Sequence, residues 1–267
     1  MNMDQYSIAS VAGTIAGLFG APGEGLEPGA APADARVAAL VPAPGIKKLL
    51  IYAPDAIGRK MVSKIPAEFQ RLEAAGFSKF PVQSVFPSKT PVCYASMFSG
   101  LAPEGHGIRQ YEKPVLSCKT IFDALPARGV RTAIVAVKDS SIDLIFRGRK
   151  VDYYSEPCDR DVTGRALLLI NAGEHDCILA YHQDYDEILH ATDPWNNAAL
   201  NAAKGHVRTF ENLVRVFDRK WGGLPRGAFF APDHGAHTDA ATGKGTHGAN
   251  IPEDMEVDHF WRFQPGK

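Results

Sequence analysis

The sequence lacks the charge excess of a protein that binds nucleic acid. Its 29 Lys and Arg residues and 30 Asp and Glu residues give a formal net charge of −1, so there is no electrostatic reason to expect nucleic acid or an anionic membrane as partner. It also has only four cysteines and no C-x-x-C pair, which excludes a dense disulfide framework. We interpret all four as reduced thiols packed in the interior, as in a cytosolic protein. They are Cys93, Cys118, Cys158 and Cys177.

Long hydrophobic runs and a basic N-terminus are absent as well. The apolar stretch 8–19 is followed by Ala21, which could pass for a cleavage site, but residues 1–7 carry Asp4 and no Lys or Arg. The positive region of a signal peptide is therefore missing. The stretch is also too short and too rich in glycine to span a bilayer. We expect a cytoplasmic protein.

The remaining composition is that of a soluble globular protein. The chain has 267 residues, of which 45% are hydrophobic and 22% charged, and this length suits one α/β domain with a sizeable core. Residues 20–45 are rich in Gly, Pro and Ala. We expect an irregular N-terminal lead-in over residues 1–45 and a single domain over residues 46–267.

Apolar runs typical of buried strands alternate with helical patterns along that domain. This alternation predicts an α/β fold with a doubly wound, mostly parallel central sheet flanked by helices. Residues 143–154 are expected to form a hairpin-like or β segment. The expected strands are 48–53, 82–86, 132–137, 176–181 and 228–231, and the expected helices are 66–75, 92–98, 119–127, 161–171 and 195–219.

Residues of metal-ligand type follow several of the expected strands. Because carboxyl ends of parallel strands meet at one edge of a sheet, we expect these side chains to converge there. Carboxylate oxygens with imidazole nitrogens suit zinc, manganese or iron. A helix cap at the first of these positions, or a polar glycine-rich surface loop at 231–248, is the alternative. The candidates are Asp55, Asp186 and His190 four residues apart, Asp233 with His234, and His247.

Thr90 lies where a strand is expected to lead into a helix. Pro91 suits the first helical position, which makes Thr90 the expected N-cap. A helix N-terminus attracts anions, and a hydroxyl there can meet a phosphate. Thr90 is therefore either a cap alone or a residue that contacts a phosphate.

Three motifs give the chain a resemblance to a known family. Residues 86–108 read F-P-S-K-T-P-V-C-Y-A-S-M-F-S-G-L-A-P-E-G-H-G-I, residues 181–190 read Y-H-Q-D-Y-D-E-I-L-H, and D-H-G at 233–235 precedes T-H-G at 246–248. In this order they resemble the alkaline phosphatase superfamily, and within it the nucleotide pyrophosphatase/phosphodiesterase branch. The resemblance runs from about Lys47 to Phe263.

The resemblance implies a hydrolase of phosphoric esters, a phosphodiesterase or phosphatase, that uses two divalent metal ions, usually zinc. It implies Thr90 as nucleophile, with a phosphothreonine intermediate that water hydrolyses. The substrate would be a small phosphate ester or phosphonate. One ion would be held by Asp55, Thr90, Asp233 and His234, and the other by Asp186, His190 and His247.

The sequence departs from the family pattern near the expected nucleophile. Cys93 stands where the phosphodiesterases have an asparagine that donates to a phosphoryl oxygen, and a thiol is a poor donor. Lys89 is the residue that could compensate, so both are expected at the substrate. The chain is short for the family, which predicts a minimal core without a large cap. A phosphonate hydrolase or phosphomutase-like relative, and a member that binds metal or phosphate without turnover, are the alternatives.

Overall fold

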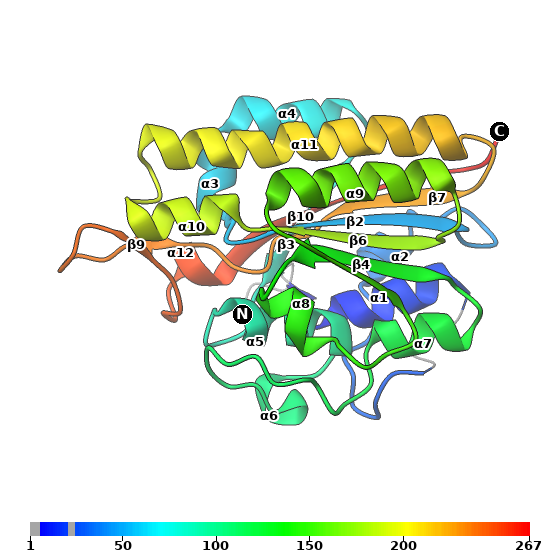
Figure 1. Ribbon diagram of the computed structural model, residues 1–267, viewed down its shortest axis with the longest axis horizontal. Coiled ribbons are helices and arrows are strands. Elements are labelled where there is room, and N and C mark those ends of the chain that lie inside the picture. Colours follow the sequence, from blue (N-terminus) through cyan, green and yellow to red (C-terminus); the bar gives the residue numbers. More distant parts are fainter. Residues whose placement is uncertain (1–5, 21–24) are drawn as a thin grey trace.

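The computed structural model describes residues 6–20 and 25–267, and its centre is an eight-stranded sheet (Figure 1). Strand β10 is antiparallel to both of its neighbours, and the other paired strands of this sheet are parallel. The expected doubly wound, mostly parallel sheet is confirmed. The strands in spatial order are β1 (Tyr6–Ser7), β3 (Ser78–Gln83), β10 (Glu256–Gln264), β7 (Arg226–Phe230), β2 (Lys48–Pro54), β6 (Cys177–His182), β4 (Thr132–Val137) and β5 (Asp152–Glu156).

Helices cover both faces of the sheet, and a small hairpin of β8 (His237–Thr238) and β9 (Gly245–Thr246) extends beyond one end (Figure 1). Among the described residues, no helix is both long enough and apolar enough to cross a membrane. One face carries α3 (Arg59–Lys64), α4 (Pro66–Ala74), α9 (Asp159–Ala172), α10 (Asp184–Ala191) and α11 (Asn197–Trp221). The other carries α1 (Ser10–Leu18), α2 (Ala35–Ala38), α5 (Thr90–Ser99), α6 (Pro103–His106), α7 (Ile121–Ala127) and α8 (Ser141–Ile145), while α12 (Pro252–Met255) precedes β10.

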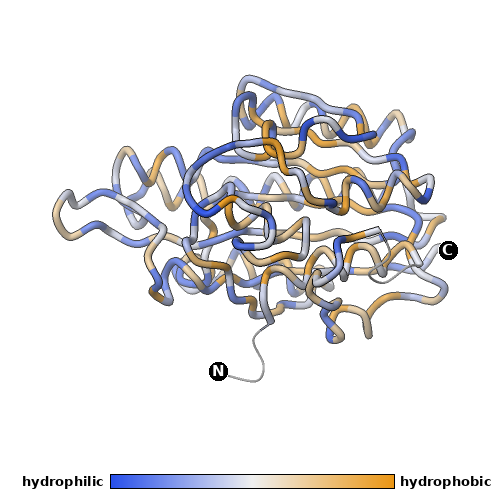
Figure 2. Tube along the Cα trace, turned by 90° about the horizontal axis from the view of Figure 1, so that it is seen from below, coloured by the Kyte–Doolittle hydropathy of each residue, from blue (hydrophilic) through white to orange (hydrophobic). Residues whose placement is uncertain are grey.

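The central strands are apolar on both sides because each side packs against helices. Along β2, Leu49 and Ile51 belong to the cluster under α1 and α5, whereas Leu50 and Tyr52 belong to the cluster under α9 and α11. Hydrophobic stretches accordingly follow the interior strands, and hydrophilic ones the outer loops (Figure 2). This two-sided burial produces the continuous apolar runs from which β2, β4, β6 and β7 were expected.

Two of the expected β segments are placed differently. The strand expected at 82–86 is β3, Ser78–Gln83, whose alternation of buried and half-buried residues differs from a continuous apolar run. The segment 143–154 is not a hairpin. Its first residues belong to helix α8, and β5 begins only at Asp152 and pairs in parallel with β4.

Strand β10 was not expected at all. Its sequence E-V-D-H-F-W-R-F-Q mixes charged and aromatic residues, yet Asp258 and His259 are buried within it. The charge of Asp258 is compensated by Arg59, whose Nε lies 3.0 Å from Asp258 Oδ1. A strand that buries polar residues with distant partners has no local apolar signature.

The N-terminal region is more ordered than an irregular lead-in. Within residues 1–45, Tyr6–Ser7 pair with β3 and Ser10–Leu18 form a largely buried helix. The expectation is therefore wrong for these residues, because the small apolar side chains of α1 pack against α5 and α7. Most of the signal-peptide argument concerns residues 1–5 and Ala21, which lie outside the described residues.

Candidate metal centre

The six carboxylate and imidazole residues singled out in the sequence lie at one edge of the sheet. Strands β7, β2 and β6 are adjacent and parallel, so the segments that follow them leave the sheet side by side. Asp233 and His234 follow β7, Asp55 follows β2, and Asp186 and His190 lie on α10 after β6. The carboxyl ends of parallel strands thus bring together residues that are up to 179 positions apart in sequence.

Asp55, Asp233 and His234 form the first group. All three are at least 98% buried, and their ligand-type atoms lie within 4.8 Å of one another. His234 Nε2 lies 3.4 Å from Asp55 Oδ1 and 3.3 Å from Asp233 Oδ2. The group therefore offers two carboxylates and one imidazole to a single point.

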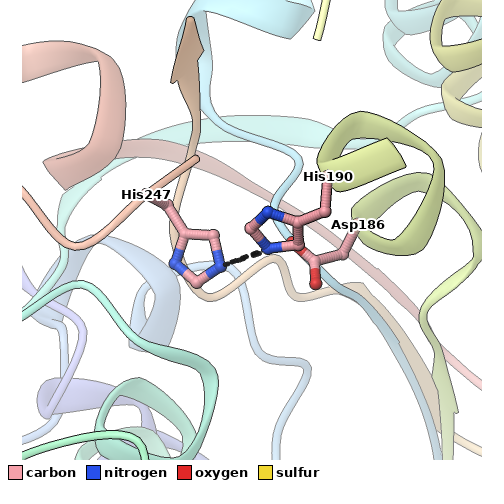
Figure 3. Close-up of side chains that lie close together, drawn as sticks. All are labelled: Asp186, His190 and His247. Carbon is pink, nitrogen blue, oxygen red and sulfur yellow. Dashed lines mark hydrogen bonds and ion pairs between the residues drawn. The ribbon is translucent and has the colours of Figure 1, made fainter. Parts of the chain in front are cut away.

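Asp186, His190 and His247 form the second group, shown in Figure 3. Asp186 and His190 are one helical turn apart on α10 and face His247, which follows β9. His247 Nε2 lies 3.1 Å from His190 Nε2 and 3.5 Å from Asp186 Oδ1. The rings of His234 and His247 stack with centroids 4.1 Å apart, so the two groups adjoin.

The backbone orients all three imidazoles in the same way. Carbonyl oxygens accept from the Nδ1 atoms of His190, His234 and His247 at 3.0, 2.9 and 2.8 Å. A neutral imidazole that donates from Nδ1 presents a lone pair at Nε2, as histidine ligands of metals do. The acceptors are the carbonyls of Gly245, Gly235 and Ser88.

The electrostatics of the site fit divalent cations. Burial, then repulsion from another site carboxylate, raises the pKa values of Asp55 and Asp233 well above their usual range. Burial, then Glu187, raises the pKa of Asp186 to about 7. Asp186 Oδ1 and Asp233 Oδ2 are buried without a hydrogen-bond partner. Two buried carboxylates and a half-buried one without a Lys or Arg partner are costly, and bound cations would remove this cost.

The imidazoles are suited to the same role. Burial lowers the pKa of His234 to about 3 and that of His247 well below its usual value. Both rings are therefore neutral at physiological pH, which is the form that binds a metal ion. The two groups thus have the residue types that zinc, manganese and iron sites require, and a bound cation would hold their carboxyls in the ionised form.

Thr90 lies beside the first group. Its Oγ1 is 3.3 Å from Asp55 Oδ1 and 3.3 Å from His234 Nε2. The expected N-cap role is wrong by one position, since Lys89 is the N-cap and Thr90 is the first residue of α5. The Thr90 hydroxyl does not cap the helix and instead points to the two ligand-type side chains.

Lys89 and Cys93, both expected at the substrate, make contacts within the protein, and their role at a substrate stays a prediction. Lys89 Nζ donates to the carbonyl oxygen of His247 at 2.7 Å, so it supports the loop that carries that histidine. Cys93 is fully buried, and its Sγ lies 3.2 Å from Ser84 Oγ. Burial, then the Asp233 carboxylate, raises the pKa of this thiol well above its usual value, so Cys93 lies enclosed near the first group.

Several supporting residues were not found from the sequence. The Tyr181 hydroxyl donates to Asp55 Oδ2, and Ser84 Oγ donates to the carbonyl of Asp233 at 2.6 Å. Ala56, between Asp55 and the first turn of α3, adopts φ 62° and donates its amide to Asp233 Oδ1. For a non-glycine residue this conformation costs energy, and such strain gathers at functional sites. Only Tyr181 had a signal, its place in the Y-H-Q-D-Y-D motif.

The sheet and the two adjoining groups at its carboxyl edge fit the alkaline phosphatase superfamily that the motifs indicated, and a family model carries the assignment. More specifically, the chain belongs to the type I phosphodiesterase / nucleotide pyrophosphatase family, a model of which matches residues 54–238. No curated protein sequence matches the chain.

Solved structures share the fold at low identity. A complex of inactive murine ectonucleotide pyrophosphatase / phosphodiesterase 5 with AMP is 16% identical with a TM-score of 0.58, covering 73% of this chain and 58% of that one. The C-terminal periplasmic domain of phosphoethanolamine transferase EptC from Campylobacter jejuni is 14% identical with a TM-score of 0.60, and the match covers 82% of this chain and 80% of that one. Phosphonoacetate hydrolase from Sinorhizobium meliloti 1021, bound to phosphonoacetate, is 17% identical with a TM-score of 0.53, and the match covers 72% of this chain and 57% of that one. The chain thus spans less than three fifths of the length of the murine phosphodiesterase and of the phosphonoacetate hydrolase.

Proposed function

We propose that the protein is a two-metal-dependent hydrolase of phosphoric esters that acts through a phosphothreonine on Thr90. The observation that carries the proposal is the position of the Thr90 hydroxyl, 3.3 Å from both Asp55 Oδ1 and His234 Nε2. A hydroxyl so close to two ligand-type atoms would share a cation that they bind, and such a cation would lower the pKa of the hydroxyl and make it a nucleophile. Family membership supports the same chemistry.

The reaction has two steps at phosphorus. Thr90 Oγ1 forms a bond to phosphorus while the bond to the leaving oxygen breaks, and that oxygen keeps the electron pair and takes a proton from solvent. Water then attacks phosphorus, phosphate leaves, and the Thr90 hydroxyl is restored. The first turn of α5 fixes Thr90 at the sheet edge, and its buried surroundings limit competing water.

The residues that would hold the metals are the two groups described above. We propose zinc, although manganese and iron accept the same ligands. Asp55, Asp233, His234 and Thr90 would hold one ion, and Asp186, His190 and His247 the other. When bound, the pair of cations supplies charge neutralisation for the attacking, non-bridging and leaving oxygens.

The substrate class is a small phosphate ester. In two of the similar structures the bound compounds are AMP and phosphonoacetate, which favours a small ligand with a phosphoryl or phosphonyl group. A phosphonate is therefore the second candidate for this site. A non-catalytic role in binding metal or phosphate is the third, and only turnover separates it from the first two.

The test combines metal content with hydrolysis of p-nitrophenyl phosphate and bis-p-nitrophenyl phosphate. We expect about two metal ions per chain, and cleavage of at least one substrate by wild-type protein. Thr90→Ala should bind metal and lose turnover, whereas Thr90→Ser should keep part of it. Thr209→Ala changes a half-buried threonine of α11 that belongs to neither group, and it should behave as wild type. Metal binding without cleavage of either ester would exclude the hydrolase and leave a phosphonate or a binding role.

A further inference from the structure

A pocket of about 440 Å³ opens directly over the candidate metal centre. Its volume is within the range of small-molecule sites. Its floor includes Asp55, Thr90, Tyr181 and Asp186, which belong to the centre or bind it. The rest of its lining comes from the start of α10 and from two segments, 111–113 and 138–141, that have no part in the proposed chemistry.

These two segments form one continuous wall, which we call the donor wall. Lys113 and Tyr111 come from the loop after α6, Lys138 and Ser140 come from the turn after β4, and Ser141 is the first residue of α8. The segments touch, because Lys113 Nζ donates to the carbonyl oxygen of Asp139 at 2.8 Å. Asp139 itself adopts φ 62°, so the turn is held in a costly conformation where it lines the pocket.

The donor wall carries two ammonium groups without an acid partner. Among the described ion pairs none involves Lys113 or Lys138, whereas basic side chains such as Arg59, Lys60, Arg131 and Arg165 are paired with acids. Lys113 uses one of three donors on a carbonyl, and Lys138 has an exposed side chain with no described side-chain hydrogen bond. Unpaired ammonium groups in a pocket leave donors available to an anion.

Two buried hydroxyls lie beside the lysines. Ser140 Oγ accepts from the amide of Asp143 at 3.2 Å, which leaves its own hydrogen to donate. The Ser141 side chain is 97% buried and has no described hydrogen bond. The acid on the pocket's other side, Glu187, already accepts from Gln183 Nε2 at 2.5 Å. The wall therefore presents two ammonium groups and two hydroxyls beside the single carboxylate of Asp139, and the carboxylate of Glu187 opposite is engaged.

The sheet order places the donor wall next to the metal centre. Strand β4 pairs with β6, and β6 pairs with β2, so Lys138 follows the strand immediately beyond the one that leads to Asp186. Neighbouring strands are about 5 Å apart. A group held by Lys138 would therefore lie about one to two strand spacings, roughly 5–10 Å, from phosphorus over the centre.

We propose that the donor wall binds a second anionic group of the substrate, a carboxylate or a further phosphate, while the metal centre binds the phosphoryl group. The inference rests on the proposed function. It narrows the substrate class to small phosphate or phosphonate compounds with two separated anionic groups. Lys138 and Lys113 select this class, and Ser140 and Ser141 complete the hydrogen bonds.

The experiment measures substrate preference in the zinc-loaded protein. Hydrolysis of phenyl phosphate is compared with that of 4-carboxyphenyl phosphate and of 1,4-phenylene bisphosphate, each also as its methyl diester. The readout is the ratio of kcat/KM between each dianionic probe and the phenyl reference. Since every variant is given the same leaving groups, differences in leaving-group reactivity cancel when ratios are compared. The carboxylate and bisphosphate arms show which anion the wall prefers.

Wild-type protein should favour at least one of the two probes over the reference. Lys138→Gln and Lys113→Gln should each lower that ratio about tenfold, the usual effect of a charged hydrogen bond. The control is Lys150→Gln. Lys150 is an exposed lysine that precedes the amino end of β5, whereas the metal centre lies at the carboxyl ends of the strands, so this variant should keep the wild-type ratio.

The outcomes separate the two claims. Hydrolysis of all substrates with the same ratio in wild type and both lysine variants would overturn the donor wall and leave the hydrolase intact. Failure of the wild-type protein to cleave any of the esters would instead overturn the proposed function, and the inference with it. A fall in the ratio for Lys150→Gln equal to that for Lys138→Gln would show a general charge effect and would also contradict the inference.

Discussion

His190 and His247 point their Nε2 atoms at each other across 3.1 Å. Each ring is bound through Nδ1 to a backbone carbonyl, so each must carry its hydrogen there to donate. When both rings are neutral, the Nε2 lone pair of His190 therefore faces the Nε2 lone pair of His247. A hydrogen bond at this distance would need a hydrogen on one of the two atoms, and neither carries one. A cation bound by both nitrogens, together with Asp186, resolves this conflict.

The first prediction concerns metal stoichiometry. His247→Ala removes one of the three ligand-type side chains of the second group and leaves the buried first group intact. Elemental analysis should therefore fall from about two zinc ions per chain to about one. His175→Gln is the matched control, because His175 is also buried but binds Asp152 away from the centre. Equal zinc content in His247→Ala and His175→Gln would contradict a site at His247.

Most of the candidate centre could be predicted because its residues directly follow apolar strands. Asp55 ends the run of β2, and Asp233 ends that of β7, and both runs are apolar because helices cover the two faces of the sheet. Because β7, β2 and β6 are adjacent and parallel, their carboxyl ends then lie side by side at one edge of the sheet. The structure juxtaposes all seven predicted ligand-type positions, and their roles stay predictions for experiment.

The remainder depends on partners distant in sequence. β10 was missed because Asp258 becomes compatible with a buried strand only through Arg59, 199 positions earlier. Cys93 was expected at the substrate because its spacing from Thr90 follows the family, but the direction of its side chain depends on Ser84 and the packing of α5. Lys138 had no pattern at all, since a single lysine after a strand is ordinary until the pocket is known.

The second prediction concerns Asp254, which holds together the loop between the two groups. Its carboxylate binds His237 Nδ1 at 2.7 Å and accepts from the Ala249 amide at 2.8 Å, and its carbonyl accepts from the Gly235 amide. Asp254→Ala should lower the free energy of unfolding by about 3 kcal/mol, because two charge-assisted hydrogen bonds are lost in a buried place. Zinc affinity should fall as well, since the loop carries both His234 and His247.

The control for Asp254 is its neighbour. Glu253 makes an exposed ion pair with Lys60 at 3.0 Å, and Glu253→Gln should change the unfolding free energy by less than about 1 kcal/mol. Chemical denaturation and competitive zinc titration would measure both variants. If Asp254→Ala bound zinc as tightly as Glu253→Gln, the loop would not depend on Asp254.

The third prediction concerns the close approach of two backbones beneath the centre. A Cβ added at Gly235 would lie 2.0 Å from the Glu253 carbonyl oxygen and 3.0 Å from the Gly58 Cα. Gly235→Ala should therefore displace His234, its chain neighbour, and reduce both stability and zinc content. Gly164→Ala is the control, since this exposed position in α9 has open space and the change should stabilise the helix by up to about 1 kcal/mol. Thermal denaturation with and without zinc measures the stability of both variants. An unaltered zinc content in Gly235→Ala would contradict the prediction that this substitution displaces His234.

The last prediction concerns pH and His206, which supports the start of α10. His206 Nδ1 lies 2.9 Å from the Tyr52 hydroxyl, and its Nε2 accepts from the amide of Tyr185, next to Asp186. Burial lowers the pKa of His206 to about 4. In the unfolded chain the same group has a pKa of about 6.5. Between these values the unfolded state binds a proton that the folded state does not.

The contribution of His206 to stability is therefore fully present above pH about 6.5 and is lost as pH falls towards 4. His206→Gln cannot take up this proton. It should be less stable than wild type at pH 7, because its hydrogen bonds to Tyr52 and Tyr185 are weaker, but the gap should narrow by about 2 kcal/mol at pH 5. Urea denaturation in a chelator, where zinc does not contribute, measures the gap at both values. Tyr52→Phe removes the hydrogen bond between Tyr52 and His206 but keeps the titrating group, so its difference in unfolding free energy from wild type should change much less between pH 7 and pH 5. If the difference between His206→Gln and wild type were the same at both pH values, His206 would take up its proton equally in the folded and unfolded states.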